Sequence, residues 1–458
     1  MARFPQAAVK RFSCALVIVV PFVLAACDSQ PNVVINFNHV TATVSPRAIG
    51  MAETGYQDPN VLANDAVEQQ RLKLLGLGLV RMDLVYQVSG DPTSKIVCGS
   101  DGCDTDPSGD QWIAAIRGAG AQPELIVNTK SFVDAANMVR HFNVDPATKR
   151  PDPARPNYVR YWIIGNEPNT SGYSSSSYSS YFNADYDAMK AVDPNIKIGG
   201  PAVAWYDVMW IKEFLGASGN RVDFVDFHGY PQQGTSDGDV EQLFRWAAST
   251  GNDVRNLRAI IAAAVPARAS GIGVEVGEWS LNWGGNAQGD TNFNTVWTAD
   301  VIGHILQGGG GSIYFGTKGN AIKWADGFDT DDGGHTVFMH LDDPKAPYHG
   351  HGMFTGEGLF RPFGQKMVSA VTSLPNVDVF ASNGAKNIVV VNKDKTASRQ
   401  AVFSLIGVPA SATVNVWQKN QNVLFRDPPV HRGVVHVNGG TFSYRLPAMS
   451  VTTFVIAQ

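Results

Sequence analysis

Two glutamates in this sequence follow apolar, strand-like segments. Glu167 lies in YWIIGNEPN (161–169), and Glu278 lies in GIGVEVGEWS (271–280). Two facing carboxylates can cleave a glycosidic bond, because one donates a proton to the leaving oxygen while the other attacks the sugar or activates water. A single glutamate at a strand end can also just cap a helix or pair with a cation. Pro168 disfavours helical angles at the residue before it, which predicts an extended backbone at Glu167.

Eight β-branched segments alternate with helical stretches, a pattern typical of βαβ units. A chain of 458 residues with 44% hydrophobic residues can bury the large core that such an array needs. Eight units predict a (β/α)8 TIM barrel over residues 46–375, with its chemistry at the carboxyl ends of the strands. The expected strands are 47–50, 79–84, 124–128, 161–165, 197–200, 224–227, 273–277 and 312–315.

The two glutamates fall at the carboxyl ends of the fourth and seventh expected strands, so we expect Glu167 and Glu278 to share one cleft. Glu275 lies three residues before Glu278 and should point to the opposite face of a regular strand. We therefore do not expect Glu275 to be catalytic. After residue 375 alternating strands replace the helical pattern and predict an antiparallel β-sandwich over 376–458. Residues 27–45 share this texture and are expected to pair with that domain.

The first 26 residues resemble an export signal, with basic residues before an apolar run. The stretch LAAC (24–27) matches a lipobox, which predicts a lipid on Cys27 and an exported bacterial envelope lipoprotein, facing the periplasm or the cell surface. An ordinary cleaved signal is the alternative and would give a secreted protein. Loss of Arg3, Lys10 and Arg11 takes the formal net charge from −5 to −8, which argues against nucleic-acid binding.

The chain has four cysteines, and the two that lie outside the export signal and the lipobox are close together in CGSDGC. In an oxidising compartment, Cys98 and Cys103 are expected to form a local disulfide, and a metal site there would need further ligands. An Asp-rich stretch at 326–340 does not match a regular calcium loop, so we expect no metal and no cofactor. GLGLVR lacks the third glycine of a dinucleotide-binding fingerprint.

The motifs GNEPN and GEWS resemble the acid/base and nucleophile motifs of retaining (β/α)8 glycoside hydrolases. The chain is most similar to glycoside hydrolase family 39, which includes β-xylosidases, α-L-iduronidases and bacterial exopolysaccharide hydrolases. The resemblance covers nearly the whole mature chain, including the closing LPAMSVTTFVIA. It implies that Glu167 is the general acid/base, that Glu278 is the nucleophile, and that Asn166 binds the sugar 2-hydroxyl. Retention requires carboxyl groups about 5 to 5.5 Å apart.

The same resemblance extends to three further residues. His228 and Tyr230 in DFHGYP match the family's active-site His-x-Tyr, and Tyr230 is expected to donate to the nucleophile. Arg81 in LVRMD matches an arginine that keeps the nucleophile ionised, with a salt bridge to Asp83 or to a helix carboxylate as the alternative.

Sugar rings stack on aromatic side chains, so aromatic residues beyond the strand ends are candidate substrate contacts. Asn128, at the end of the third expected strand, could reach a sugar hydroxyl or cap a helix. Each aromatic residue could instead belong to the core. The candidates are Trp205, Tyr206, Trp279, Trp283 and Trp324.

An exported hydrolase meets envelope glycans and secreted exopolysaccharide, so endo-acting cleavage of such a polysaccharide is the first expectation. An exo-acting, β-xylosidase-like glycosidase is the alternative within the class. A non-catalytic glycan-binding lipoprotein is the alternative outside it. We expect a monomer that binds polysaccharide or oligosaccharide and reaches the membrane only through its lipid.

Overall fold

The computed structural model describes residues 30–457 with several gaps. Residues 1–29 lie outside the described residues, and with them the export signal and Cys27. Cys98, Cys103 and Asn128 also lie outside, as do Trp283 and Trp324, so their roles stay predictions. The gaps are 53–62, 64–65, 67–68, 71–72, 74–75, 85–107, 128–130, 233–235, 283–286, 316–337, 341–347, 351–364, 385 and 423–428.

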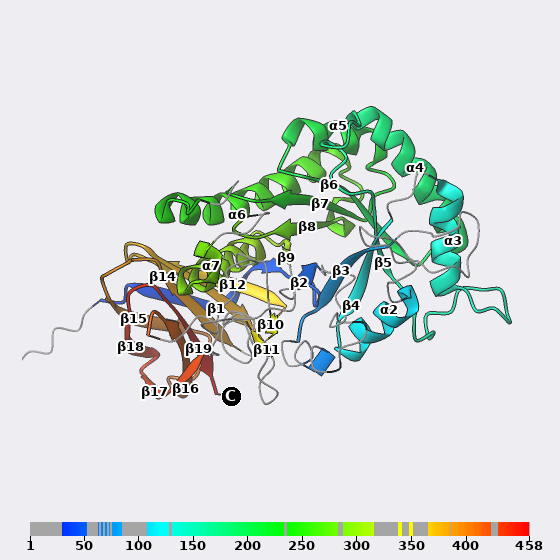
Figure 1. Ribbon diagram of the computed structural model, residues 1–458. Helices are drawn as coiled ribbons and strands as arrows, with labels where there is room; N and C mark the ends of the chain where they lie inside the picture. The colour runs from blue at the N-terminus through cyan, green and yellow to red at the C-terminus, as the bar shows by residue number, and fades with distance from the viewer. Residues whose placement is uncertain are drawn as a thin grey trace, which may run out of the picture. The chain divides into compact units, whose positions relative to one another are not determined.

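Eight parallel strands form a closed barrel in chain order (Figure 1). The ring closes because the first strand pairs with both the second and the last. This confirms the predicted (β/α)8 barrel. The strands are β2 Ile49–Ala52, β3 Leu79–Leu84, β4 Gln122–Val127, β5 Tyr161–Ile164, β6 Lys197–Val203, β7 Phe224–Gly229, β8 Gly273–Trp279 and β9 Gly311–Phe315.

Helices cover the outside of this barrel (Figure 1). Five of them begin at a Ser or Asp whose side chain accepts a hydrogen bond from the helix backbone, namely Ser108, Ser131, Ser174, Asp207 and Asp239. Within the described part of the chain, no helix is both long and apolar enough to cross a membrane. The helices are α2 Gly109–Gly118, α3 Phe132–Asn143, α4 Ser175–Val192, α5 Val208–Ser218, α6 Val240–Ala264 and α7 Asn292–Gln307, with short 3-10 turns at Ala269–Gly271 and Ala287–Asp290.

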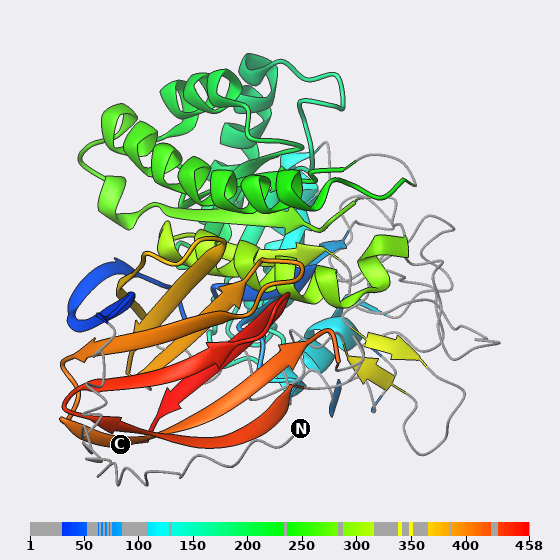
Figure 2. The ribbon, with the colours of Figure 1, turned by 90° about the vertical axis from the view of Figure 1, so that its left-hand side faces the viewer.

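A second sheet is formed by the N-terminal strand and the C-terminal strands, and its pairing also closes into a ring (Figure 2). This confirms the predicted β-domain, in the form of a continuous nine-stranded ring whose strands pair antiparallel except for β1 and β15, which run parallel. Its core contains Phe403 and Phe442, whose rings stack at 4.3 Å. The strands are β1 Val33–Thr43, β12 Lys366–Thr372, β13 Val377–Asn383, β14 Asn387–Asn392, β15 Arg399–Ile406, β16 Ser411–Asn420, β17 Val430–Asn438, β18 Thr441–Leu446 and β19 Ser450–Ile456; β10 Phe338–His340 and β11 Tyr348–Gly350 form a separate hairpin.

The segment before residue 375 corrects the predicted boundary between the domains. The sequence pattern places residues 366–372 in the barrel, yet β12 pairs with β1 and β13 in the second sheet. Met367, Val368 and Val371 are spaced so that they fit a helix as well as a strand. Pairing with β1, which is remote in sequence, decides between the two.

The second sheet packs on helix α7 of the barrel. A Cβ atom added at Gly303 of α7 would lie 2.2 Å from the ring of Phe380 in β13, so only glycine permits this approach. Polar contacts accompany it, with His304 Nε2 3.2 Å from Asp378 Oδ2 and Lys393 Nζ 2.5 Å from the same oxygen. We call these three residues together with Asp300 the junction cluster.

Candidate active site

The backbone after β5 takes an unusual course at the first glutamate. Glu167 has a φ of 45°, and Gly165 before it has a φ of 74°. The expectation of an extended Glu167 was therefore wrong. Pro168 disfavours only the right-handed helical region. The left-handed conformation is held by the Glu167 N–H, which donates to the Ala202 carbonyl at 2.9 Å. A non-glycine residue in this region stores strain, as is common at functional sites.

A bulge in β8 positions the second glutamate. Phe227 of β7 pairs with Val276, but His228 pairs with Glu278, so one residue of β8 is extra. That residue is Gly277, and a Cβ atom there would lie 2.2 Å from Asp226 Oδ1.

The bulge also corrects the direction expected for Glu275. Its carboxylate pairs with Arg47 inside the barrel, while Glu278 pairs with Arg81, so both side chains turn inward. The simple alternation of a regular strand fails here because the extra residue shifts the side-chain period.

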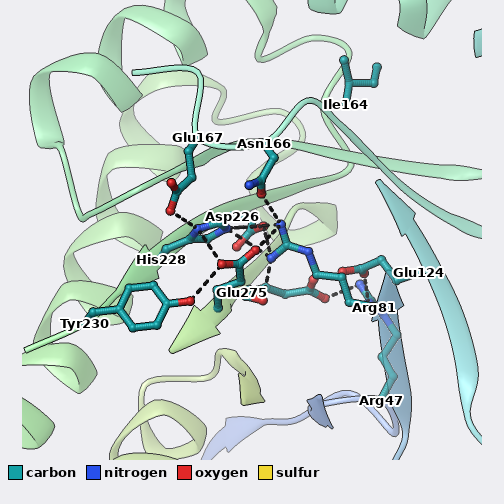
Figure 3. Close-up of polar contacts among 12 residues, drawn as sticks. Arg47, Arg81, Glu124, Ile164, Asn166, Glu167, Asp226, His228, Tyr230 and Glu275 are labelled. Atoms are coloured by element: carbon teal, nitrogen blue, oxygen red, sulfur yellow. Dashed lines mark hydrogen bonds and ion pairs between the residues drawn. The ribbon is translucent and has the colours of Figure 1, made fainter. Parts of the chain in front are cut away.

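Both glutamates lie beside His228, and Figure 3 shows Glu167 and His228 pointing toward each other. His228 Nδ1 lies 2.9 Å from Glu167 Oε1 and 3.4 Å from Glu278 Oε2. One carboxylate oxygen of Glu167 and one of Glu278 lie within 4.8 Å of each other. Tyr230 donates its hydroxyl to Glu278 Oε2 at 2.9 Å.

Arg81 is fully buried and contacts His228, Asn166 and Glu278. Its Nη2 donates to Asn166 Oδ1 at 3.0 Å and lies 3.5 Å from Glu278 Oε1, and its Nη1 donates to the Gly277 carbonyl. Both Nη atoms lie 3.2 Å from His228 Nε2. A guanidinium can only donate, so Nε2 accepts and the ring proton is assigned to Nδ1, which donates to Glu167.

Burial and the neighbouring charges set the protonation of two of these groups. Burial lowers the pKa of His228 to about 3, so the ring is neutral at ordinary pH. Burial also raises the pKa of Glu167, although Arg81 acts in the opposite direction. A carboxyl group with a raised pKa is suited to donate a proton, as a general acid must.

Of the aromatic residues predicted to contact substrate, Trp279 is buried and Trp205 is exposed. Trp279 is fully buried, packs against Trp297 and Tyr314, and donates from Nε1 to Ser312 Oγ at 3.1 Å. The prediction that Trp279 binds substrate is therefore wrong, because it belongs to the layer between barrel and helices. Trp205 is 52% exposed and directly follows Ala204, whose N–H donates to Asn169 Oδ1 beside the Glu167 loop.

Three ionisable residues near the glutamate pair, Asp226, Arg47 and Glu124, were not predicted from the sequence. Asp226 Oδ2 lies 3.4 Å from Arg81 Nη1, and Arg47 donates to Glu124 Oε2 at 2.7 Å. Both acids are fully buried inside strands. A signal was available in the sequence, because FVDFH and PELIV place acids within strand segments that are otherwise apolar.

The donor atoms of Glu167, His228 and Glu278 lie close enough together to hold a metal ion, as do those of Asp300, His304 and Asp378. In both groups a positively charged side chain of the protein already lies beside the acids. Arg81 is 3.5 Å from Glu278, and Lys393 is 2.5 Å from Asp378. Ion pairing within the chain accounts for both groups.

Sequence comparison locates this site within a known family model. The model for Glycosyl hydrolases family 39 matches residues 156–316, a segment that contains both glutamates, His228 and Tyr230. A β-xylosidase from Geobacillus stearothermophilus is 35% identical over 81 residues. The match spans 16% of this chain and only 16% of that relative's length. Both findings support the glycosidase class and family 39 within it.

Solved glycosidase structures share the fold at low sequence identity. An α-L-arabinofuranosidase from Thermotoga maritima aligns with a TM-score of 0.71 and 16% identity, covering 93% of this chain and all of that one. A GH51 arabinofuranosidase from Xanthomonas axonopodis pv. citri gives 0.72 at 14% identity, with the same coverage. A family 44 xyloglucanase from Paenibacillus polymyxa gives 0.64 at 13% identity, covering 93% of this chain and 99% of that one. At these identities the likeness establishes the fold.

Proposed function

We propose that this protein is a retaining glycosidase of family 39 that works by double displacement. The spacing of the two glutamates carries the proposal, because one carboxylate oxygen of each lies within 4.8 Å of the other. Retaining glycosidases hold their carboxyl groups about 5 to 5.5 Å apart, whereas inverting ones leave a wider gap for water.

Each residue of the site has a place in this reaction. His228 Nδ1 donates to Glu167 Oε1, which leaves Oε2 to carry the proton that the leaving oxygen takes. Glu278 attacks the anomeric carbon and forms a covalent ester, and Glu167 then accepts a proton from the water that hydrolyses it. Arg81 donates a hydrogen bond to the side-chain oxygen Oδ1 of Asn166. The side-chain NH2 group of Asn166 can therefore bind the sugar 2-hydroxyl.

The stereochemistry of the first product tests this mechanism. Proton NMR recorded during early cleavage of an aryl glycoside should show a product with the substrate's anomeric configuration. A first product of opposite configuration would rule out the double displacement.

For the substrate, we propose endo-acting cleavage of an exopolysaccharide or envelope glycan. The half-exposed Trp205 beside the acid/base loop supports this, because a sugar beyond the scissile bond could stack on it. The relative's name supports the alternative of an exo-acting β-xylosidase. Product lengths decide between them, since endo action releases oligosaccharides from the start and exo action releases single sugars.

We also propose that the protein is exported and anchored by a lipid on Cys27. The basic and apolar pattern of residues 1–26 supports this proposal. Labelling of bacterial cells with a radioactive fatty acid should mark the protein, and Cys27→Ser should abolish the label. Label that persists in the variant would refute the anchor.

A further inference from the structure

The interior of the barrel holds more acids than bases. Besides the neutral His228, six ionisable side chains among the described residues form this group: the guanidiniums of Arg47 and Arg81, and the carboxyls of Glu124, Asp226, Glu275 and Glu278. All four acids and Arg81 are buried, and Arg47 is nearly so. Four carboxylates facing two guanidiniums would leave two uncompensated negative charges, which a buried site does not tolerate.

Protons on two of the acids restore neutrality. Burial raises the pKa of Asp226 to about 7, against the opposing effect of Arg81. Burial likewise raises the pKa of Glu275 well above its usual value, with Arg47 opposing. With Asp226 and Glu275 protonated, each guanidinium retains one carboxylate partner.

Two of these four acids, Asp226 and Glu278, lie beside Arg81. Asp226 Oδ2 lies 3.4 Å from one of its nitrogens, and Glu278 Oε1 lies 3.5 Å from another, so one guanidinium is shared almost equally by two carboxyls. The other two, Glu124 and Glu275, lie beside Arg47. The other charged or titratable groups facing Asp226 are Glu124 from β4, Glu275 from β8 and His228 from β7, with Tyr178 of α4 more remote.

We propose that Asp226 is a positioning residue of the reaction, which becomes the counter-ion of Arg81 when Glu278 is esterified. The inference rests on the proposed function. In the first step a Glu278 oxygen bonds to the anomeric carbon, the bond to the leaving oxygen breaks, and that oxygen takes the proton of Glu167. Glu278 is then neutral, and Asp226 gives its proton to bulk water. In the second step water adds its oxygen to the anomeric carbon and its proton to Glu167, Glu278 leaves as a carboxylate, and Asp226 regains a proton.

Asp226→Asn isolates this role, because the amide keeps the shape but cannot ionise. In the variant the covalent intermediate leaves Arg81 without a carboxylate partner, so its formation slows while its hydrolysis does not. We expect kcat/KM for a dinitrophenyl glycoside to fall about tenfold, which corresponds to one pKa unit of lost charge stabilisation. The burst of dinitrophenol that marks accumulation of the intermediate should shrink or vanish.

A matched control is Asp300→Asn. Asp300 is also a fully buried acid whose pKa burial raises, and it lies 3.9 Å from a cation, Lys393, but on helix α7 away from the glutamate pair. This variant should keep the wild-type burst and kcat/KM per folded molecule. If Asp226→Asn keeps them too, or if it slows both steps in parallel, the inference is overturned.

Proton release gives a second readout. Below pH 7, trapping of the wild-type enzyme with a 2-deoxy-2-fluoro dinitrophenyl glycoside should release a proton beyond any from the leaving group, as seen with an indicator dye. Asp226→Asn should lack this extra proton, and equal release by both enzymes contradicts the proposal.

Thermal unfolding tests, without any substrate, whether Asp226 is protonated in the folded protein. The pKa of Asp226 is raised in the folded state, so the stability it contributes is present below its unfolded pKa and is lost as pH rises through about 7. Asp226→Asn should remove this loss, which flattens the Tm profile between about pH 4 and pH 7. An unchanged profile overturns the inference. A wild-type enzyme that cleaves no glycoside would instead refute the proposed function, and the flattening would still be measurable.

Discussion

The barrel interior and the junction cluster both combine buried carboxyls with cations, but they differ in how each cation is divided between its acids. Lys393 is 2.5 Å from Asp378 and 3.9 Å from Asp300, whereas Arg81 is 3.4 Å from Asp226 and 3.5 Å from Glu278. In the junction cluster, Asp378 carries the charge: burial opposes its ionisation, yet His304 and Lys393 outweigh this and hold its pKa below the usual value. Burial and the neighbouring Asp378 raise the pKa of Asp300 well above its usual range, so it stays protonated. One acid and one lysine then form a fixed pair.

The barrel interior has no such fixed partition. Arg81 is shared between Asp226 and Glu278, and in the proposed reaction Glu278 loses its charge while Asp226 gains one. The comparison teaches that buried ion pairs of similar composition can serve different ends. A cation that lies much closer to one acid than to the other clamps two parts of a structure, whereas a cation shared equally by two acids can respond to chemistry.

The largest effect that separates the two regions is expected at the nucleophile. Glu278→Ala should reduce hydrolysis of an aryl glycoside by at least about 10⁴-fold, because no covalent intermediate can form. Binding of an oligosaccharide, measured by calorimetry, should remain detectable. The control is Glu241→Ala, an exposed glutamate of α6 that pairs loosely with Arg245. Wild-type turnover in Glu278→Ala would remove Glu278 from the mechanism.

The next largest effect is expected at the proton donor. Glu167→Gln should lower kcat/KM for a substrate with a poor leaving group by about 10² to 10⁴-fold. In the wild type the rate should fall as pH rises through the pKa of Glu167, which burial raises, because the acid must be protonated. The variant should lack this alkaline limb. A pH profile identical to that of the wild type would assign the proton transfer to another group.

Stability rather than activity should report on the junction. Gly303→Ala places a Cβ atom against the ring of Phe380 and should destabilise the fold by about 1–3 kcal/mol. Gly118→Ala in α2 is the matched control, because nothing lies within 4 Å of a Cβ atom there. Denaturant unfolding measures both. Equal stability of the two variants would show that α7 can move away from β13 at little cost.

The smallest effect is expected from the charge pair of the junction. Asp378→Asn leaves Lys393 without its ionised partner and should cost about 1–2 kcal/mol at neutral pH. Because the folded pKa of Asp378 is lowered, its contribution is present above the unfolded pKa and is lost as pH falls. The difference in Tm between wild type and variant should therefore shrink in acid. A difference that grows in acid would contradict the assigned charge.

The sequence predicted the elements whose signals are local. Strands such as β5 and β8 are short β-branched runs that end in a glycine and a glutamate, and their number and spacing indicate a barrel. The resemblance of GNEPN, GEWS and DFHGYP to known motifs placed five of the residues that the structure brings together: Asn166, Glu167, His228, Tyr230 and Glu278.

Errors arose where a neighbouring strand decides the outcome. The direction of Glu275 depends on how β8 pairs with β7, and the burial of Trp279 depends on Trp297 and Tyr314. The strand state of residues 366–372 depends on β1. None of these partners is near in sequence, so no local pattern could reveal them.

By itself, then, the sequence determined the class of fold and the two acids at its rim, because strand periodicity and the residues that follow a strand are properties of short segments. Tertiary structure alone decided the electrostatics beneath those acids. Whether Asp226 is ionised depends on its burial and on its separation from Arg81 and Glu278, which three different stretches of chain supply. Coulomb interactions act through space, and closure of the barrel fixes the distances on which they depend.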